Sequence, residues 1–194
     1  MSLRVVSVPC LSDNYAYLVV AADGGAAVVD PSEPAPVLAA LAQEGATLRE
    51  IWCTHHHLDH VGGVEALVER TPRLVVRGST YDVDHRRIPR ATNAHPDGDT
   101  FAFGGHTVRV LAIPGHTLGA IAFVVDGALF SGDTLFLGGC GRVFEGTMPM
   151  MAQSMRILRE LDPELRVYCG HEYTAANLRF ARTIEPGSED IARA

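Results

Sequence analysis

The stretch Thr54-His55-His56-His57-Leu58-Asp59-His60 carries the most specific chemical signal in this sequence. It follows the apolar run Ile51-Trp52-Cys53 and fits the pattern H-x-H-x-D-H. The residues at the pattern positions are His55, His57, Asp59 and His60. Imidazole and carboxylate groups are common metal ligands, and so many of them together would be costly in a plain apolar core. The stretch therefore predicts a metal site on a loop that follows a buried strand.

Three later segments each place one metal-type side chain after a glycine at the end of an expected strand. They are Ile113-Pro114-Gly115-His116-Thr117, Ser131-Gly132-Asp133-Thr134 and Tyr168-Cys169-Gly170-His171-Glu172. Glycine lets the backbone turn sharply, which brings the next side chain to the edge of a sheet. One such turn would be ordinary, but three of them after an H-x-H-x-D-H pattern indicate a single shared site.

Seven candidate ligands suit two metal ions better than one. We expect His55, His57 and His116 to form the first site, because the i,i+2 spacing on an extended loop points both loop imidazoles the same way. Asp59, His60 and His171 are expected to form the second site. Asp133 is expected to bridge the two.

Two neighbouring polar residues are given other expectations. His56 should point away from its neighbours and lie outside the metal site. Asp30 ends an expected strand and is a candidate to accept a hydrogen bond from a ligating histidine, since such histidines normally donate their second ring N–H. An Asp-Pro turn with no such role is the alternative for Asp30.

The rest of the chain predicts an α/β (α+β) domain, an αβ/βα sandwich of two mixed β-sheets flanked by helices. Strands are expected over residues 4–8, 15–20, 26–30, 48–53, 74–76, 101–103, 106–112, 121–125, 128–130 and 166–169. Helices are expected over residues 34–42, 64–69, 150–161 and 174–184. Residues 81–98 should be irregular, with His95 at the surface.

The composition favours a soluble globular protein, and we expect one domain over residues 1–194. Hydrophobic content is 47% and charged content 20%, and no apolar run approaches the roughly 20 residues that span a bilayer. The N-terminus lacks the apolar core of a signal peptide, so we expect a cytoplasmic protein without a membrane partner.

The net charge is −7 and all sixteen basic residues are arginine, which argues against nucleic-acid binding. Without a C-x-x-C pair, the cysteines are expected to be reduced and buried. They are Cys10, Cys53, Cys140 and Cys169.

Together these segments resemble the metallo-β-lactamase superfamily and, within it, the glyoxalase II (hydroxyacylglutathione hydrolase) family. The resemblance rests on the three glycine turns, the triple histidine and several other stretches. These are Leu11-Ser12-Asp13-Asn14-Tyr15, Thr134-Leu135-Phe136, Gly139-Cys140-Gly141-Arg142-Val143-Phe144-Glu145-Gly146-Thr147, Tyr173-Thr174, Asn177-Leu178-Arg179-Phe180-Ala181 and Glu185-Pro186-Gly187. The resemblance spans nearly the whole chain.

The resemblance implies a metallo-β-lactamase fold and a metal-bridged hydroxide that hydrolyses S-D-lactoylglutathione to glutathione and D-lactate. Two divalent ions would be held per chain, with zinc expected first and iron or manganese as alternatives. Asp59 and Asp133 would be the catalytic carboxylates beside the hydroxide. The residues implied to contact the glutathione thioester are Arg142, Phe144 and Tyr173.

This sequence departs from the family pattern in three places. Phe144 stands where relatives often have tyrosine, so one hydroxyl contact to the substrate is missing. Ala120 replaces a histidine that usually follows G-H-T-x-G. The C-terminal helical substrate domain of full-length relatives is absent from these 194 residues.

Two other activities share the fold. A persulfide dioxygenase would use one iron, held by a histidine of the first motif with His116 and Asp133, and would leave the second group idle. The di-zinc β-lactamases carry cysteine where this chain has Asp133, which makes that activity the weaker alternative. A binding scaffold without catalysis would be expected to have lost ligands, and none is lost here. The sequence leaves the number of associating chains open.

Overall fold

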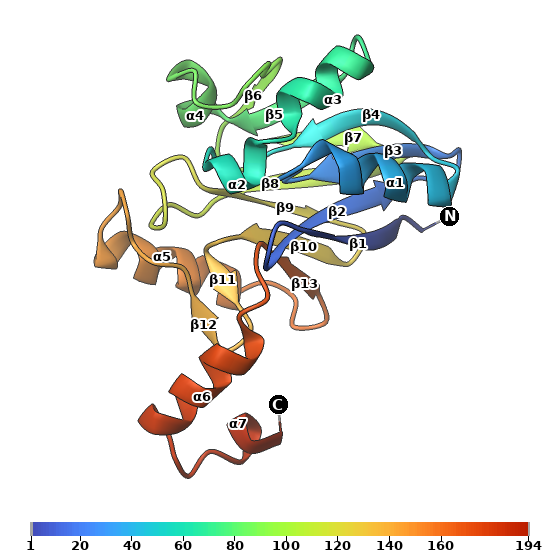
Figure 1. The fold of residues 1–194 in the computed structure, drawn as a ribbon. Coiled ribbons are helices and arrows are strands. Elements are labelled where there is room, and N and C mark those ends of the chain that lie inside the picture. The colour runs from blue at the N-terminus through green and yellow to red at the C-terminus, as the bar shows by residue number, and fades with distance from the viewer. Residues whose placement is uncertain (1, 194) are drawn as a thin grey trace.

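Two mixed β-sheets pack face to face, and helices cover the outer side of each (Figure 1). The computed structural model describes residues 2–193. The strand order is β1-β2-β3-β4-β5-β6 in the first sheet and β13-β10-β9-β8-β7 in the second. Each sheet contains both parallel and antiparallel pairs. The observed architecture confirms the predicted αβ/βα sandwich.

The first sheet and its helices come from the N-terminal half of the chain. The strands are β1 (Arg4–Cys10), β2 (Asn14–Val20), β3 (Gly25–Val29), β4 (Thr47–Trp52), β5 (Val75–Ser79) and β6 (Asn93–His95). The helices are α1 (Pro34–Glu44), α2 (Leu58–Val61), α3 (Val64–Arg70) and α4 (Thr80–Asp84). Helix α1 ends at Gly45, whose positive φ of 59° gives the left-handed conformation that glycine adopts without strain.

The second sheet and the remaining helices come from the C-terminal half. The strands are β7 (Thr100–Phe103), β8 (His106–Ala112), β9 (Ile121–Val125), β10 (Ala128–Gly132) and β13 (Arg166–Cys169), with β11 (Leu135–Phe136) and β12 (Gly139–Cys140) as a separate short pair. The helices are α5 (Met148–Arg159), α6 (Thr174–Ile184) and α7 (Glu189–Arg193). Helix α5 covers the outer face of the second sheet, where Met155 and Leu158 pack in one apolar cluster with residues of that sheet.

The central strands β2 and β3 of the first sheet are buried on both faces. In β2, Leu18 packs under α1 and α3, while the next residue, Val19, faces the second sheet. Trp52 lies fully buried between the sheets, with its ring centroid 5.3 Å from the Phe101 ring. A strand covered on both sides reads as a continuous apolar run, which is why the strand positions could be predicted.

Residues 81–98 differ from their prediction. They include the end of α4 and all of β6, and His95 is buried instead of exposed. His95 Nδ1 lies 2.8 Å from an Asp99 carboxylate oxygen, and Nε2 lies 3.3 Å from Arg77. Arg77 is itself paired with Glu50 at 2.8 Å. These partners come from two strands, β4 and β5, and from the loop before β7, so local sequence gives no sign that the histidine can be buried.

The cysteine prediction holds in part. All four are free thiols, with Cys10 and Cys53 buried and Cys169 half-buried. Cys140 is exposed; it lies on β12, which is paired only with the short strand β11.

No helix among residues 2–193 combines the length and apolar character that crossing a bilayer requires. The single-domain organisation over residues 1–194 stays a prediction.

Trp52→Ala should lower the free energy of unfolding by about 3 to 5 kcal/mol, since the cavity would open between the two sheets. Urea unfolding followed by far-UV circular dichroism measures this, because Trp52 is the only tryptophan and its fluorescence is lost with it. Phe180→Ala is the control: its side chain is 66% exposed, so a change within about 0.5 kcal/mol is expected. Equal changes in the two variants would contradict the central position of Trp52.

Candidate active site

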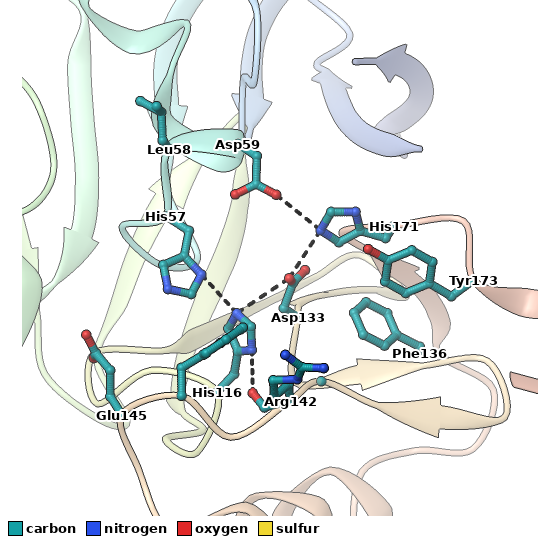
Figure 2. Close-up of a pocket in the computed structure, with 12 residues that line it drawn as sticks. His57, Leu58, Asp59, His116, Asp133, Phe136, Arg142, Glu145, His171 and Tyr173 are labelled. Atoms are coloured by element: carbon teal, nitrogen blue, oxygen red, sulfur yellow. Dashed lines mark hydrogen bonds and ion pairs between the residues drawn. The ribbon is translucent and has the colours of Figure 1, made fainter. Parts of the chain in front are cut away.

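The four predicted segments meet at one end of the sandwich (Figure 2). β10 and β13 are parallel neighbours, with Gly132 opposite Cys169, so Asp133 and His171 leave the same edge of the second sheet. The loop after β4 is tied to that sheet by the N–H of Ile121, which donates to the Thr54 carbonyl at 2.9 Å. The predicted convergence is therefore observed.

Two glycines make this convergence possible. Gly132 has a positive φ of 49°, and a Cβ there would come within 2.4 Å of Thr54 Oγ1. A Cβ on Gly170 would come within 2.3 Å of an Asp133 carboxylate oxygen. Any larger residue at either position would push the strand ends away from the histidine loop.

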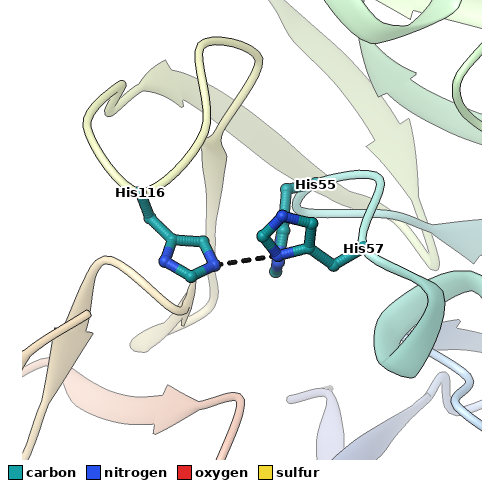
Figure 3. Close-up of side chains that lie close together, drawn as sticks. All are labelled: His55, His57 and His116. Atoms are coloured by element: carbon teal, nitrogen blue, oxygen red, sulfur yellow. Dashed lines mark hydrogen bonds between the residues drawn. The ribbon is translucent and has the colours of Figure 1, made fainter. Parts of the chain in front are cut away.

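His55, His57 and His116 form the first group, as predicted (Figure 3). Each offers a ring nitrogen, and these three atoms lie within 4.8 Å of one another. His116 Nε2 is 3.0 Å from His57 Nδ1. Two ring nitrogens that face each other at this distance have the spacing of ligands around a common cation.

Asp59, His60 and His171 form the second group, also as predicted. The Asp59 Oδ2 atom lies 3.4 Å from His171 Nε2 and 3.6 Å from His60 Nε2. The half-buried Asp59 contributes from the first turn of α2, and this short helix also carries the buried His60.

Asp133 lies between the two groups. Its Oδ2 atom is 3.5 Å from His116 Nε2 and 3.2 Å from His171 Nε2, so one oxygen faces a member of each group. Its Oδ1 atom is 3.4 Å from His60 Nε2. A carboxylate in this position can bridge two cations.

Several polar atoms in the site are buried without a hydrogen-bond partner. Among residues 2–193 they include His55 Nε2, His60 Nε2 and Asp133 Oδ1. Leaving such atoms unpaired costs about 1 to 3 kcal/mol each. Metal ions bound at the two groups would satisfy all three atoms, so the donor set fits a metal centre.

The protonation of the site also fits a cation. Burial lowers the pKa of His55, His57 and His116, which keeps the first group neutral and able to bind metal near pH 7. Burial alone would also lower the pKa of His60 and His171, but Asp133 and further carboxylates outweigh it and raise both to about 10. The second group therefore holds protons that a metal ion would displace.

The Nδ1 partners of four histidines direct their Nε2 atoms into the site. His60 Nδ1 lies 3.1 Å from Asp30, His171 Nδ1 2.9 Å from Asp13, and His116 Nδ1 2.7 Å from the Arg142 carbonyl. His55 Nδ1 lies 3.1 Å from Thr54 Oγ1, which itself donates to Asp30. Because each Nδ1–H is used outward, each Nε2 is left free for a cation.

Asp30 is therefore placed to accept a hydrogen bond from His60, as expected for a residue at this strand end. It also accepts the Thr54 N–H at 2.8 Å, so it holds the start of the histidine loop.

The sequence pattern assigns no role to Asp13 or to Asn14, whose side-chain amide donates to the Asp59 carboxylate at 3.1 Å. Both lie in a segment that carries the resemblance, and no other local signal marks them.

His56 points away from the metal-type groups, as predicted. Its Nε2 atom lies 2.5 Å from Arg87, and its Nδ1 atom lies 3.4 Å from Asp82 Oδ1. Burial and the neighbouring Arg87 lower the pKa of His56 to about 4.

The two groups open onto a cavity of about 680 Å³. The predicted substrate residues Arg142, Phe144 and Tyr173 line it, together with Leu58, Phe136 and Glu145, which the sequence does not single out. Tyr173 stacks on His171 with ring centroids 4.8 Å apart, and the Arg142 guanidinium lies 5.6 Å from the Phe144 ring centroid. Figure 2 shows Tyr173 and Phe136 on the His171 side and Glu145 on the His57 side.

Known proteins share both the sequence and the fold. Residues 12–171 match the model of the metallo-β-lactamase superfamily. A hydroxyacylglutathione hydrolase of Synechococcus sp. (strain JA-2-3B'a(2-13)) is 51% identical over 192 residues, covering 97% of this chain and 75% of that protein.

Two solved structures are also similar. ETHE1 from Myxococcus xanthus superposes with a TM-score of 0.78 at 30% identity, over 98% of this chain and 88% of that chain. TTHA1623 in a di-iron-bound form superposes with a TM-score of 0.69 at 32% identity, over 87% of this chain and 92% of that chain. With a family model that matches most of its length and a relative that shares half of its residues, this chain belongs to the metallo-β-lactamase superfamily and, within it, to the hydroxyacylglutathione hydrolase (glyoxalase II) family.

Proposed function

We propose that this protein hydrolyses hydroxyacylglutathione thioesters, S-D-lactoylglutathione first, at a centre that holds two divalent metal ions. Zinc is our first choice of metal, with iron or manganese as alternatives. His55, His57 and His116 would hold one ion, Asp59, His60 and His171 the other, and Asp133 both. We propose the cytoplasm as the compartment, from the sequence alone.

One observation carries the proposal: Asp133 Oδ2 lies within 3.5 Å of a histidine from each of two complete three-residue groups. A site for a single ion has no use for the second group. The curated relative is named for this hydrolysis, and the solved TTHA1623 structure is described as di-iron-bound. The relative supports the hydrolysis, and the TTHA1623 structure supports two metal ions in the present chain.

Metal ions in such a centre lower the pKa of coordinated water, which makes hydroxide available near neutral pH, and they polarise a carbonyl oxygen. Asp59 is suited to orient the attacking water. Asn14 and both neighbouring histidines contact its Oδ2 atom, and Figure 2 shows its other oxygen on the cavity side.

The leaving group needs little help. A thiol has a pKa of about 8.5, so the thiolate can leave without a strong general acid. This agrees with a cavity in which most titratable side chains belong to the metal-type groups and the remaining carboxylate, Glu145, is paired with Arg87. Arg142 is the one arginine among the described residues that line the cavity, and it would bind a carboxylate of the glutathione moiety.

The dioxygenase alternative predicts a different metal count. It needs one iron and leaves Asp59, His60 and His171 without a role, although these three residues are brought together with their ligand atoms within 4.8 Å.

Asp133→Ala should reduce thiol release from S-D-lactoylglutathione at least about 100-fold, because it removes the bridge between the groups. The metal content, measured by elemental analysis after dialysis, should fall from near two equivalents per chain to one or fewer. Asp84→Ala, at the exposed end of α4, is the matched control and should change neither quantity. A wild-type protein that keeps one iron and consumes oxygen with glutathione persulfide would instead favour the dioxygenase.

Asp30→Asn should weaken metal affinity by about 10- to 100-fold without removing a ligand, since a buried amide replaces the carboxylate that faces His60 Nδ1. Titration of the metal-free protein with zinc against a competing chelator measures this. Asp23→Asn is the control, because Asp23 is an exposed turn residue paired with Arg49. Equal affinities of Asp30→Asn and wild type would remove Asp30 from the site.

Arg142→Ala should raise the KM for lactoylglutathione about tenfold and change kcat much less, if the guanidinium only binds substrate. Initial rates of thiol release over a range of substrate concentrations separate the two constants. Arg109→Ala, on an exposed position of β8, serves as control. An unchanged KM would show that Arg142 is only a surface charge.

A further inference from the structure

Residues 141–147, called the rim loop below, form one wall of the cavity and carry Arg142 and Phe144. The base of the rim loop is bound to the turn that carries His116. The N–H groups of Phe144 and Glu145 donate to the His116 carbonyl at 3.2 and 3.3 Å. The Arg142 carbonyl in turn accepts from His116 Nδ1 at 2.7 Å. A shift of the rim loop would therefore displace both the cavity wall and the Arg142 carbonyl that accepts from His116.

Glu145 supplies a side-chain anchor for the rim loop. Its Oε2 atom accepts the N–H of Leu118 at 3.0 Å and Arg87 Nη1 at 3.1 Å, and its Oε1 atom accepts Arg87 Nη2. Arg87 belongs to the connection between α4 and β6, so the ion pair joins the rim loop to a segment that is distant in the sequence. A bidentate contact between a guanidinium and a carboxylate fixes the relative orientation of the two side chains as well as their distance. Both side chains are only 24% exposed, so water screens this ion pair less than it would a surface pair.

Two further groups hold Arg87 in place. Asp82 is fully buried, and its Oδ1 atom lies 3.6 Å from Arg87 Nη1. Neither of its carboxylate oxygens has a hydrogen-bond partner among residues 2–193. His56 lies between them, 2.5 Å from Arg87 Nη2 and 3.4 Å from Asp82. If Arg87 turned to solvent, the buried Asp82 charge would lose its nearest cation, so Arg87 is kept facing Glu145.

We propose that the Arg87–Glu145 pair is a latch that sets substrate affinity by keeping the rim loop in its binding position, with Asp82 and His56 as positioning residues for Arg87. The proposal rests on the function proposed above, because it concerns the wall that would hold the glutathione moiety. Opening the latch reduces the fraction of molecules whose rim loop is placed for binding. If that fraction fell to a tenth, apparent substrate affinity would fall tenfold while the chemical step stayed unchanged.

Limited proteolysis tests the latch without any substrate. Trypsin cleaves after arginine, and Arg142 is the only arginine or lysine between Arg109 and Arg156. Release of a fragment that begins at Val143, followed by mass spectrometry, reports opening of the rim loop. We expect Arg87→Ala and Glu145→Gln to release it about tenfold faster than wild type, with Arg87→Lys in between.

Arg90→Ala is the matched control, because Arg90 lies three residues away and pairs with Glu65 in an exposed contact remote from the rim loop. It should be cleaved at the wild-type rate. Glu145→Gln keeps the shape and the acceptor for the Leu118 N–H, so the latch is tested even if loss of Arg87 unfolds the protein. Equal fragment release from wild type, Glu145→Gln and Arg90→Ala would overturn the latch.

Kinetics provide the second readout. Arg87→Ala and Glu145→Gln should raise the KM for lactoylglutathione about tenfold and lower kcat less than about threefold, at unchanged metal content. A fall in kcat at constant KM would also overturn the latch, since it would indicate a defect at the metal centre. A wild-type protein that cleaves no thioester would end the proposed function, whereas the trypsin comparison would still decide whether the latch exists.

Discussion

The fold is organised around one electrostatic requirement: a set of imidazoles and carboxylates is buried at one end of the sandwich and needs a cation to pair with. His55, His60 and Asp133 each direct a buried, unpartnered atom toward the others. Burying these polar atoms without a partner costs free energy, and a bound ligand that pairs with them would remove that cost. Parallel pairing of β10 with β13 and the tie between Thr54 and Ile121 supply the rigidity that keeps the groups together. Without a cation, the second group stays together only by holding protons between its histidines and carboxylates.

The parts of this arrangement that the sequence predicts are those that local pattern encodes. Apolar runs gave the strands, and glycine followed by a ligand-type residue marked three of the turns that meet at the site. The sandwich could therefore be predicted, and so could the convergence of the seven metal-type residues, three in each group with Asp133 between them; their binding of metal stays a prediction. Asp30 could be named as a histidine partner because it ends a strand beside a proline, at the same edge of the first sheet as the histidine loop.

Other features depend on contacts between distant segments, which no local pattern encodes. His95 is buried because Asp99, four positions away, and Arg77, on the neighbouring strand β5, satisfy both of its nitrogens, and the Arg77 contact depends on the pairing of β5 with β6. The pairing of Asp13 with His171 joins residues 158 positions apart. The same holds for Arg87 and Glu145, which are 58 positions apart. In each case a polar residue has a role only because the tertiary fold supplies its partner.

The metal-type groups and the cavity wall differ in how they are held, and this difference has a functional consequence. The groups follow strand ends directly or lie on the short helix α2, and the buried Asp30 and the backbone tie between Thr54 and Ile121 hold them, so their geometry changes little when a surface loop moves. The rim loop has no sheet of its own and is held by backbone bonds to the His116 turn and by one ion pair. Substitutions near Arg87 can therefore alter substrate affinity while the reaction centre stays intact. The rim loop and the metal-type groups are still coupled, because the Arg142 carbonyl accepts from His116 Nδ1. A large displacement of the rim loop would therefore also change the orientation of His116.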